Sequence, residues 1–339
     1  ALCGSLAAIS AANAGDLTVT GGVDMSWISK DGDVTGNPIG LGSNLTFKGS
    51  GELDNGWKFD LTVANTNGNA YSSSNVNIDM GGLGQINIDQ GDSGNGIAAM
   101  DDKMPTAWEE AWGNGLSTGV KTVVGAGSAM NIMYTPPTVL GTTMTFTRAF
   151  NMGTTDTADL NTGGHVTANY REATDFTINI NPSLGTEVLS GLNIFGGAHQ
   201  KLTQERKPIT AMSAYQMVAG ATYDIGPVSL GFARSGHING KKITTGAVTH
   251  YTGAMWGVAF NVNDDLSVSY GFHNSRKAGY ENGRDMGVEA NRRIEVESLQ
   301  VAYSMGGASI RLAETKGDNL HFSSANDKDI TVVSVALAF

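Results

Sequence analysis

Cysteine is almost absent from this sequence, in which Cys3 is the only one. It falls in residues 1–14, an uncharged segment of small and apolar residues whose end, Ala12–Ala14, fits the small-x-small pattern of a signal-peptidase site. We expect residues 1–14 to be the remainder of a signal peptide and the mature chain to start at Gly15. A mature chain without cysteine has no disulfide, no catalytic thiol and no thiolate metal site.

Charged residues and long apolar runs are also scarce. Only 16% of the 339 residues are charged, against about 25% in an ordinary soluble domain, and the net charge is −11. No run of about 18 apolar residues occurs, which excludes a transmembrane helix. An exported chain of this kind, with 46 Gly and 7 Pro, is either a secreted soluble β protein or an outer-membrane β-barrel.

Alternating apolar and polar residues are present instead, along almost the whole chain. Between Asp16 and Trp27 one parity is apolar and the other polar, and the same period of two returns after the turn at Asn55 and Gly56. An Asn-Gly pair between two alternating runs is a strong signal for a β-hairpin. The pattern therefore predicts antiparallel strands with one apolar and one polar face.

The connections between these strands alternate in length. The short ones are 54–56, 81–82, 136–137, 182–190, 224–227, 261–265 and 305–307. The long ones are 30–42, 65–72, 91–127, 151–163, 203–212, 235–249, 275–292 and 316–326. Short turns on one side and long loops on the other are typical of bacterial outer-membrane barrels. We predict an all-β fold in which residues 15–339 form one transmembrane antiparallel β-barrel of about sixteen strands, with short periplasmic turns and long external loops.

A soluble β-sandwich would give a similar alternation. It would not explain the one-sided loop lengths, nor the aromatic residues at many strand ends, among them Trp27, Trp57, Tyr223 and Phe260. Aromatic residues gather at both interfaces of a membrane protein, so their placement favours the barrel.

The segment 91–127 is the longest part of the chain without strand periodicity. It holds two lysines against five carboxylates, which are Asp92, Asp101, Asp102, Glu109 and Glu110. Pro105 suits a first helical position, and Gly113 suits a position just past a helix end. Trp108 and Trp112 would share one face of that turn. We predict a short helical turn that presents Glu109 and Glu110 on the side away from the two Trp.

Three stretches near the C-terminus resemble a known family. They are DDLSVSYGFHNS from Asp264, VAYSMGGASIRLAE from Val301 and DITVVSVALAF ending at Phe339. They are similar to the Gram-negative trimeric outer-membrane porins, most closely the alphaproteobacterial type. The resemblance implies a homotrimer, an assembly signal at Phe339, and a third external loop, here 91–127, that folds into the lumen. The Pro-Glu-Phe-Gly stretch of the enterobacterial members is absent from this loop.

A general diffusion porin is the first functional hypothesis: a water-filled pore for passive passage of small hydrophilic solutes and ions. The five loop acids would stand across a narrow lumen from cations on the wall and create a transverse field. The inward parity nominates as these cations Lys48, Lys58, Arg171, Lys201 and Arg311. The net charge of −11 favours a preference for cations.

Outer-membrane lipid and lipopolysaccharide are the expected partners, and nucleic acid is not. Short basic runs at Gln204–Lys207 and Gly240–Lys242 lie in predicted external loops, where they could contact lipopolysaccharide phosphates. Gly21, Gly49 and Gly51 flatten the outward face of the first two strands, so we expect the subunit interface there.

Three alternatives stay open: a solute-specific channel, an adhesive or structural barrel, and a barrel enzyme. An enzyme needs a nucleophile or an acid-base pair at a fixed location. The six histidines are spread one per element and no HExxH motif occurs, so we expect no catalysis. We also expect no cofactor. The best metal candidate is Ca²⁺, without the EF-hand spacing, on Asp101, Asp102, Glu109 and Glu110.

Overall fold

The computed structural model describes residues 15–30, 37–67, 73–91, 94–152, 170–182, 189–203, 213–240, 248–281, 284–286 and 293–338. Its strands are β1 Leu17–Lys30, β2 Ile39–Glu52, β3 Lys58–Thr66, β4 Ser73–Asp79, β5 Gln85–Asp89, β6 Asn131–Thr135, β7 Thr142–Ala149, β8 Tyr170–Ile180, β9 Leu192–Thr203, β10 Ala214–Ile225, β11 Val228–Ile238, β12 Val248–Asn261, β13 Leu266–Glu281, β14 Arg284–Met286, β15 Arg293–Met305, β16 Ala308–Asp318 and β17 Lys328–Ala338. Short 3₁₀ turns are η1 Gly81–Leu83, η2 Gly96–Met100, η3 Ala126–Ser128 and η5 Leu320–Phe322. No helix within these ranges is long and apolar enough to cross a membrane.

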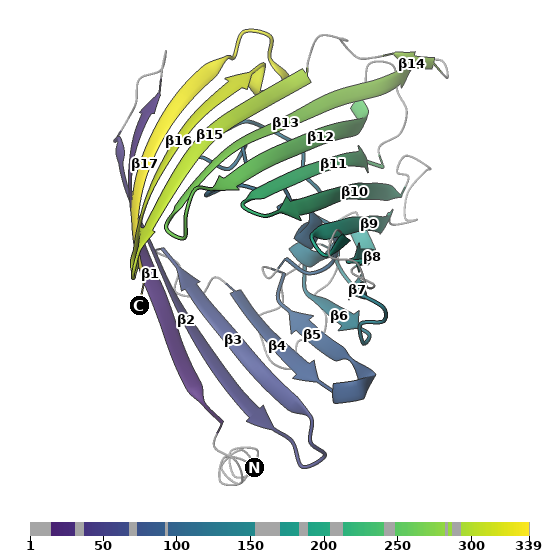
Figure 1. The fold of residues 1–339 in the computed structure, drawn as a ribbon. Coiled ribbons are helices and arrows are strands. Elements are labelled where there is room, and N and C mark those ends of the chain that lie inside the picture. Colours follow the sequence, from purple (N-terminus) through teal and green to yellow (C-terminus); the bar gives the residue numbers. More distant parts are fainter. Residues whose placement is uncertain are drawn as a thin grey trace.

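The strands form one closed antiparallel ring (Figure 1). Each strand pairs with its neighbour in sequence, and β17 returns to pair with β1, where Val23 stands opposite Leu337. The three-residue β14 pairs only with the outer end of β13, and β13 pairs with β15 along most of its length. Sixteen described strands therefore make the ring, as the sequence predicts. Closure pairs the backbone of every strand on both sides, which lipid requires.

Short turns lie at one end of the ring and long connections at the other, which confirms the predicted layout. The turn between β2 and β3 is an example. Leu53 N–H donates to Trp57 O (2.7 Å), and Gly56 N–H donates to Leu53 O (2.8 Å). Gly56 has a φ of +81°, a left-handed conformation that glycine adopts without steric cost, so the Asn-Gly signal has a backbone cause. We refer to this end as periplasmic.

The two parities of the strands face two environments. Outward side chains such as Leu41 (72% exposed) and Phe232 (52%) form the apolar outer surface. The alternation of the sequence breaks at Glu172 and Thr174, and the β8–β9 register shifts between Tyr170 and Ala173 at the same place. The broken pattern therefore reflects a β-bulge or a similar irregularity.

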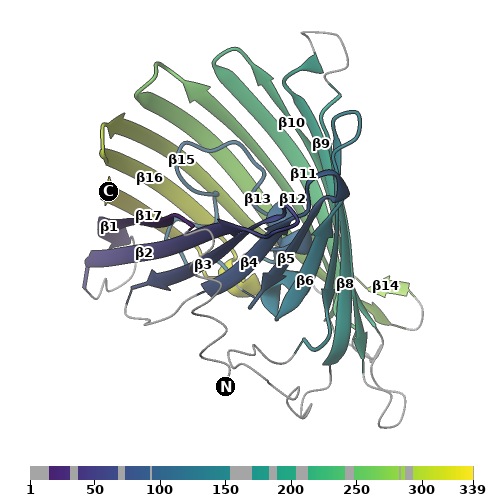
Figure 2. The same ribbon diagram turned by 90° about the horizontal axis from the view of Figure 1, so that it is seen from below.

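The hydrophobic core lies inside the ring, between one wall and the segment that connects β5 to β6. Figure 2 shows this segment within the barrel. We call residues 91–127 the inner loop, and the lumenal face of β8–β13 and β15–β17 the loop-bearing wall. Apolar loop residues pack on inward wall residues in two large clusters. One contains Ile97, Met100, Met104, Val123, Phe195, Val218, Ala233 and Met255, and the other Leu116, Ile294, Val296, Leu320, Phe322, Ile330 and Val332.

Candidate pore constriction

The two ends of the inner loop are held by one buried carboxylate. Asp175 of β8 accepts hydrogen bonds at Oδ2 from the backbone N–H groups of Ile97 (3.0 Å) and Ala126 (2.9 Å). His199 Nδ1 of β9 lies 2.6 Å from Asp175 Oδ1, and both side chains are at most 1% exposed. Three charge-assisted contacts offset the cost of burying this carboxylate, so the same group fixes both the start and the end of the loop.

Other inward side chains bind the backbone between these ends. Gln216 Oε1 of β10 accepts from the N–H groups of Val124 (2.7 Å) and Gly125 (3.2 Å). Two serines of β13 act in the same way: Ser275 Oγ accepts from Lys121 N–H (2.9 Å) and Ser269 Oγ from Ala107 N–H (2.8 Å). The loop backbone has few partners of its own, and the wall supplies them, as burial demands.

Residues 105–113 contain no helix, and a hydrogen-bonded turn, from Gly113 N–H to Glu110 O (2.9 Å), is described only at their end, so the predicted helical turn from Pro105 is not formed. Gln300 of β15 accepts hydrogen bonds at Oε1 from the N–H groups of Trp108 (3.1 Å) and Glu109 (3.0 Å), and its Nε2 donates to Glu109 O (2.6 Å). A helix would pair these groups internally. The prediction of a helical turn is wrong because the wall side chains take the backbone groups instead.

The two Trp side chains do not share a face. The guanidinium of Arg311 on β16 lies 4.8 Å from the centroid of the Trp108 ring, a cation–π contact. Trp112 meets His273 of β13 edge-on, with ring centroids 6.4 Å apart. Each Trp therefore attaches the loop to a different strand.

The described loop acids lie close enough to affect one another. The pKa of Asp101 is raised to about 7. Burial is the largest cause, and the negative charges of Asp102 and Glu110 add to it. Burial, together with a hydrogen bond that Glu110 donates to Glu109 and the charge of Glu109, raises the pKa of Glu110 to about 7. Burial and the charge of Glu110 raise the pKa of Asp102 as well. Burial and the neighbouring carboxylates make the ionised forms costly, so Asp101 and Glu110 hold protons near neutral pH.

The lumenal face of β1–β5, which we call the open wall, meets the inner loop at its two sides. Asn95 Nδ2 donates to Asn87 Oδ1 of β5 (2.8 Å), Gly91 N–H donates to Asp89 Oδ2 (3.0 Å), and Ile28 of β1 packs against the cluster that contains Leu116.

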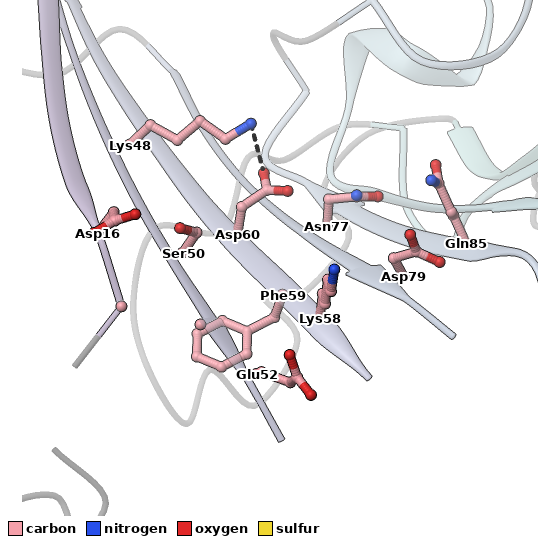
Figure 3. A pocket seen from close by; sticks show the side chains of 12 residues that line it. Asp16, Lys48, Ser50, Glu52, Lys58, Phe59, Asp60, Asn77, Asp79 and Gln85 are labelled. Carbon is pink, nitrogen blue, oxygen red and sulfur yellow. Dashed lines mark ion pairs between the residues drawn. The ribbon is translucent and has the colours of Figure 1, made fainter. Parts of the chain in front are cut away.

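The open wall lines a hollow of about 700 Å³ near the periplasmic end (Figure 3). Lys48 Nζ lies 3.5 Å from Asp60 Oδ2. Lys58 of β3 stands directly opposite Glu52 of β2 and Asp79 of β4. These two nominated lysines thus have carboxylate neighbours on their own wall.

The other predicted site residues are placed as follows. Arg311 donates to Asp24 and to Ser334 (2.7 Å) in addition to its contact with Trp108, so it does reach the inner loop. Lys201 is partly buried on β9, opposite Ala214 of β10. Asp92, Phe339 and the side chain of Arg171 lie outside the described residues.

One motif of enzymes occurs in the inner loop without its usual setting. Residues Gly115–Gly119 read GLSTG and match the GxSxG pattern, and Ser117 Oγ lies 3.2 Å from His321 Nε2. In hydrolases this serine stands on a strand-to-helix turn. Here the segment is an irregular loop, and no described carboxylate contacts the other ring nitrogen of His321. The pair joins the inner loop to the β16–β17 loop, as does the bond from His321 N–H to Thr118 O (2.9 Å).

The calcium candidates stay a prediction. Among the described residues, no three Asp, Glu, His or Cys side chains are arranged so that they could hold a metal ion. The four loop acids are all described, so the geometry gives the Ca²⁺ prediction no support.

The sequence pattern does not single out the residues that anchor the loop, above all Asp175 and Gln300. One signal for a covered wall was available. On β15 the inward parity holds Ile294 and Val296, both 0% exposed, while Glu295 and its parity face outward. Apolar residues on an otherwise polar lumenal parity indicate that something packs on that wall.

Comparisons with known proteins agree with this geometry. A family model described as Gram-negative porin matches residues 1–339. An anion-selective porin from Comamonas acidovorans has a TM-score of 0.62 at 15% identity, over 96% of this chain and 100% of that one. OmpF of Salmonella typhi in complex with daunomycin has a TM-score of 0.64 at 10% identity (96% and 98%). In-vitro folded OmpT of Vibrio cholerae, in a trimer form, has a TM-score of 0.63 at 9% identity (96% and 100%). No curated protein matches the sequence.

The chain belongs to the Gram-negative porin family. Its closed ring of sixteen strands with an inner loop is the porin fold. It is an outer-membrane β-barrel and a diffusion porin, a channel rather than an enzyme.

Proposed function

We propose that this porin gives passive passage to small hydrophilic solutes and ions, prefers cations, and is narrowed by its acidic inner loop. The observation that carries the preference is an excess of carboxylates on both sides of the lumen. The described loop holds four acids and two lysines, and the hollow of the open wall is lined by four acids and two lysines. Fixed negative charge raises the local concentration of cations.

The fold does not decide the sign of this preference. The Comamonas acidovorans protein has a similar fold and is anion-selective. Selectivity must therefore come from the charges on the lumenal side chains, which differ between such distant sequences.

The reversal potential of the purified protein in a planar bilayer, under a KCl gradient, tests the proposal. The parent protein is expected to prefer K⁺. The variant with Asp101→Asn, Asp102→Asn, Glu109→Gln and Glu110→Gln is expected to lose most of that preference. Glu314→Gln on the outer face is the matched control and should leave the potential unchanged. A parent that prefers Cl⁻ would contradict the cation preference, and an unaffected loop variant would contradict the role of the loop.

We further infer that the porin is a homotrimer that associates through the outer face of β1 and β2. A side chain added at Gly49 would meet nothing within 4 Å, so the outer surface is open at this position in one protomer, whereas the ring of Phe59 lies over Gly51. The Vibrio cholerae protein of similar fold was obtained in a trimer form. Lipopolysaccharide contacts stay a prediction, because Gln204–Lys207 and Lys241–Lys242 lie outside the described residues.

Gly49→Trp should weaken the trimer, because a large side chain would hold the two subunit surfaces apart. Gly236→Trp on β11 is the control, since Gly236 also has nothing within 4 Å but lies on another part of the ring. The trimer band in native electrophoresis should shift to monomer at a lower temperature for Gly49→Trp alone. Equal behaviour of the two variants would place the interface elsewhere.

A further inference from the structure

The charged side chains of the hollow in the open wall are arranged in a regular order. Four inward side chains stand in one row across four neighbouring strands: Glu52 of β2, Lys58 of β3, Asp79 of β4 and Gln85 of β5. Directly opposite side chains in antiparallel strands lie about 5 Å apart at Cβ. Lys58 is therefore flanked by a carboxylate on each side, and Figure 3 shows it between Glu52 and Asp79.

The charges of the hollow do not balance. Its carboxylates are Asp16, Glu52, Asp60 and Asp79, and its cations are Lys48 and Lys58. Lys48 forms an ion pair with Asp60, with 3.5 Å between Lys48 Nζ and Asp60 Oδ2. Lys58 has no ion pair within 4 Å in the part of the chain that the structure describes. The ammonium group of Lys58 and the carboxylates of Asp16, Glu52 and Asp79 thus have no ion pair among the described residues, and the surplus of charge is negative.

We propose that this hollow is a binding subsite for small solutes that carry one carboxylate and two cationic groups, that is, basic amino acids. The Lys58 ammonium receives the carboxylate of the solute. Glu52 and Asp79 receive the two cationic groups, one on each side of Lys58. The subsite rests on the proposed function, because a solute reaches it only through a conducting lumen.

The expected affinity is low, and that suits a channel. The hollow is open to water, where an ion pair at 4 Å gains only about 1 kcal/mol by Coulomb's law. Several such contacts make a weak site, and transport requires that a solute also leaves. A solute without charged groups makes none of these ion pairs. A simple anion is repelled, because the hollow has more carboxylates than ammonium groups.

Block of the single-channel KCl current in a planar bilayer tests the subsite, with three probes of matched length. L-lysine carries all three groups, cadaverine lacks the carboxylate, and L-norleucine lacks the side-chain ammonium. Lysine is expected to block at a concentration several-fold lower than cadaverine, and norleucine least of all. Equal block by lysine and cadaverine in the parent protein overturns the proposal.

Two variants test which side chain of the hollow contacts which charged group of the solute. Lys58→Gln should bring the lysine block down to the level of cadaverine, because only the carboxylate contact is removed. Asp79→Asn should weaken the block by lysine and cadaverine together. It keeps an oxygen that can accept from Gly81 N–H, as Asp79 Oδ1 does at 2.9 Å, so the turn after β4 is preserved.

Lys316→Gln on the outer face is the matched control, because it removes an exposed lysine outside the lumen. It should leave all three block constants unchanged. A Lys58→Gln channel that still discriminates lysine from cadaverine overturns the proposal. A channel that conducts KCl but does not discriminate among the probes overturns the subsite alone, whereas correctly folded protein without conductance overturns the proposed function as well.

Discussion

The loop-bearing wall and the open wall follow the same alternation in sequence, but their inward side chains do different things. On the loop-bearing wall, Asp175 and Gln300 are 0% and 1% exposed and bind the loop backbone. On the open wall, Asp60 is 23% exposed in its side chain and pairs with Lys48 beside water. A polar residue on the lumenal parity can thus be either a structural anchor or a contact for solutes, and burial decides which.

Because of this difference, the same substitution should change the free energy of unfolding by different amounts on the two walls. Leaving a buried donor or acceptor without its partner costs about 1–3 kcal/mol, and breaking a buried ion pair costs about 3–5 kcal/mol. An exposed ion pair is worth about 0–1 kcal/mol. The comparison can therefore be tested by making the same substitution on each wall.

Asp175→Ala is expected to have the largest effect. It removes the acceptor of Ile97 N–H, Ala126 N–H and His199, all of which are buried. The free energy of unfolding, measured by urea titration in detergent or lipid, should fall by about 3–5 kcal/mol. The open-channel current should also become noisier, because both ends of the inner loop lose their anchor.

The matched substitution on the open wall is Asp60→Ala, which breaks the pair with Lys48. It should change the free energy of unfolding by about 0–1 kcal/mol. Similar losses for the two variants would contradict the distinction between the walls.

Gln300→Ala is expected to have a smaller effect on stability. It leaves the N–H groups of Trp108 and Glu109 without their acceptor in a partly buried place, at a cost of about 2–3 kcal/mol. Asn77→Ala on the open wall is the control and should stay within about 0.5 kcal/mol of the parent, as surface substitutions do. The measurement is again equilibrium unfolding. A Gln300→Ala protein as stable as the control would show that the loop does not depend on wall side chains.

The effect of pH should be smaller and should act mainly on selectivity. The pKa of Asp101 and that of Glu110 are raised to about 7. Ordinary carboxylates lose their charge near pH 4, so these two should already lose theirs as the pH falls through about 7. The cation preference measured by reversal potential should thus decrease between pH 8 and pH 6. A preference constant down to pH 5 would contradict the raised pKa values.

The same pKa shifts set the direction of the stability effect. Both acids bind protons more tightly in the folded state than in the unfolded one, whose carboxylates titrate near pH 4. The contribution of these two acids to stability must then fall as the pH rises from about 4 to about 7, and it does not change further above that window. Substituting Asp101→Asn and Glu110→Gln together should flatten this part of the pH profile.

Much of the barrel could be predicted from local pattern, and the inner loop only in part. The hairpin at Gly56 and the terminal runs around Val301 point to strands and turns because their signals are local. The helical turn at 105–113 was wrong because its signals, Pro105 and Gly113, are local too, whereas the competing acceptors Ser269 and Gln300 lie more than 150 residues away in sequence.

The sequence by itself determined the ring: a period of two, with turns of alternating length, leaves a closed antiparallel barrel as the structure that pairs every strand in lipid. It also determined that an acidic loop interrupts the series. Only the tertiary structure decided that this loop lies mainly on β8–β13 and β15–β17 and leaves most of the lumenal face of β1–β5 open to water. The reason is physical. The loop lies where distant strands together offer buried acceptors such as Asp175 and an apolar surface around Phe195, and no single segment of sequence contains that surface.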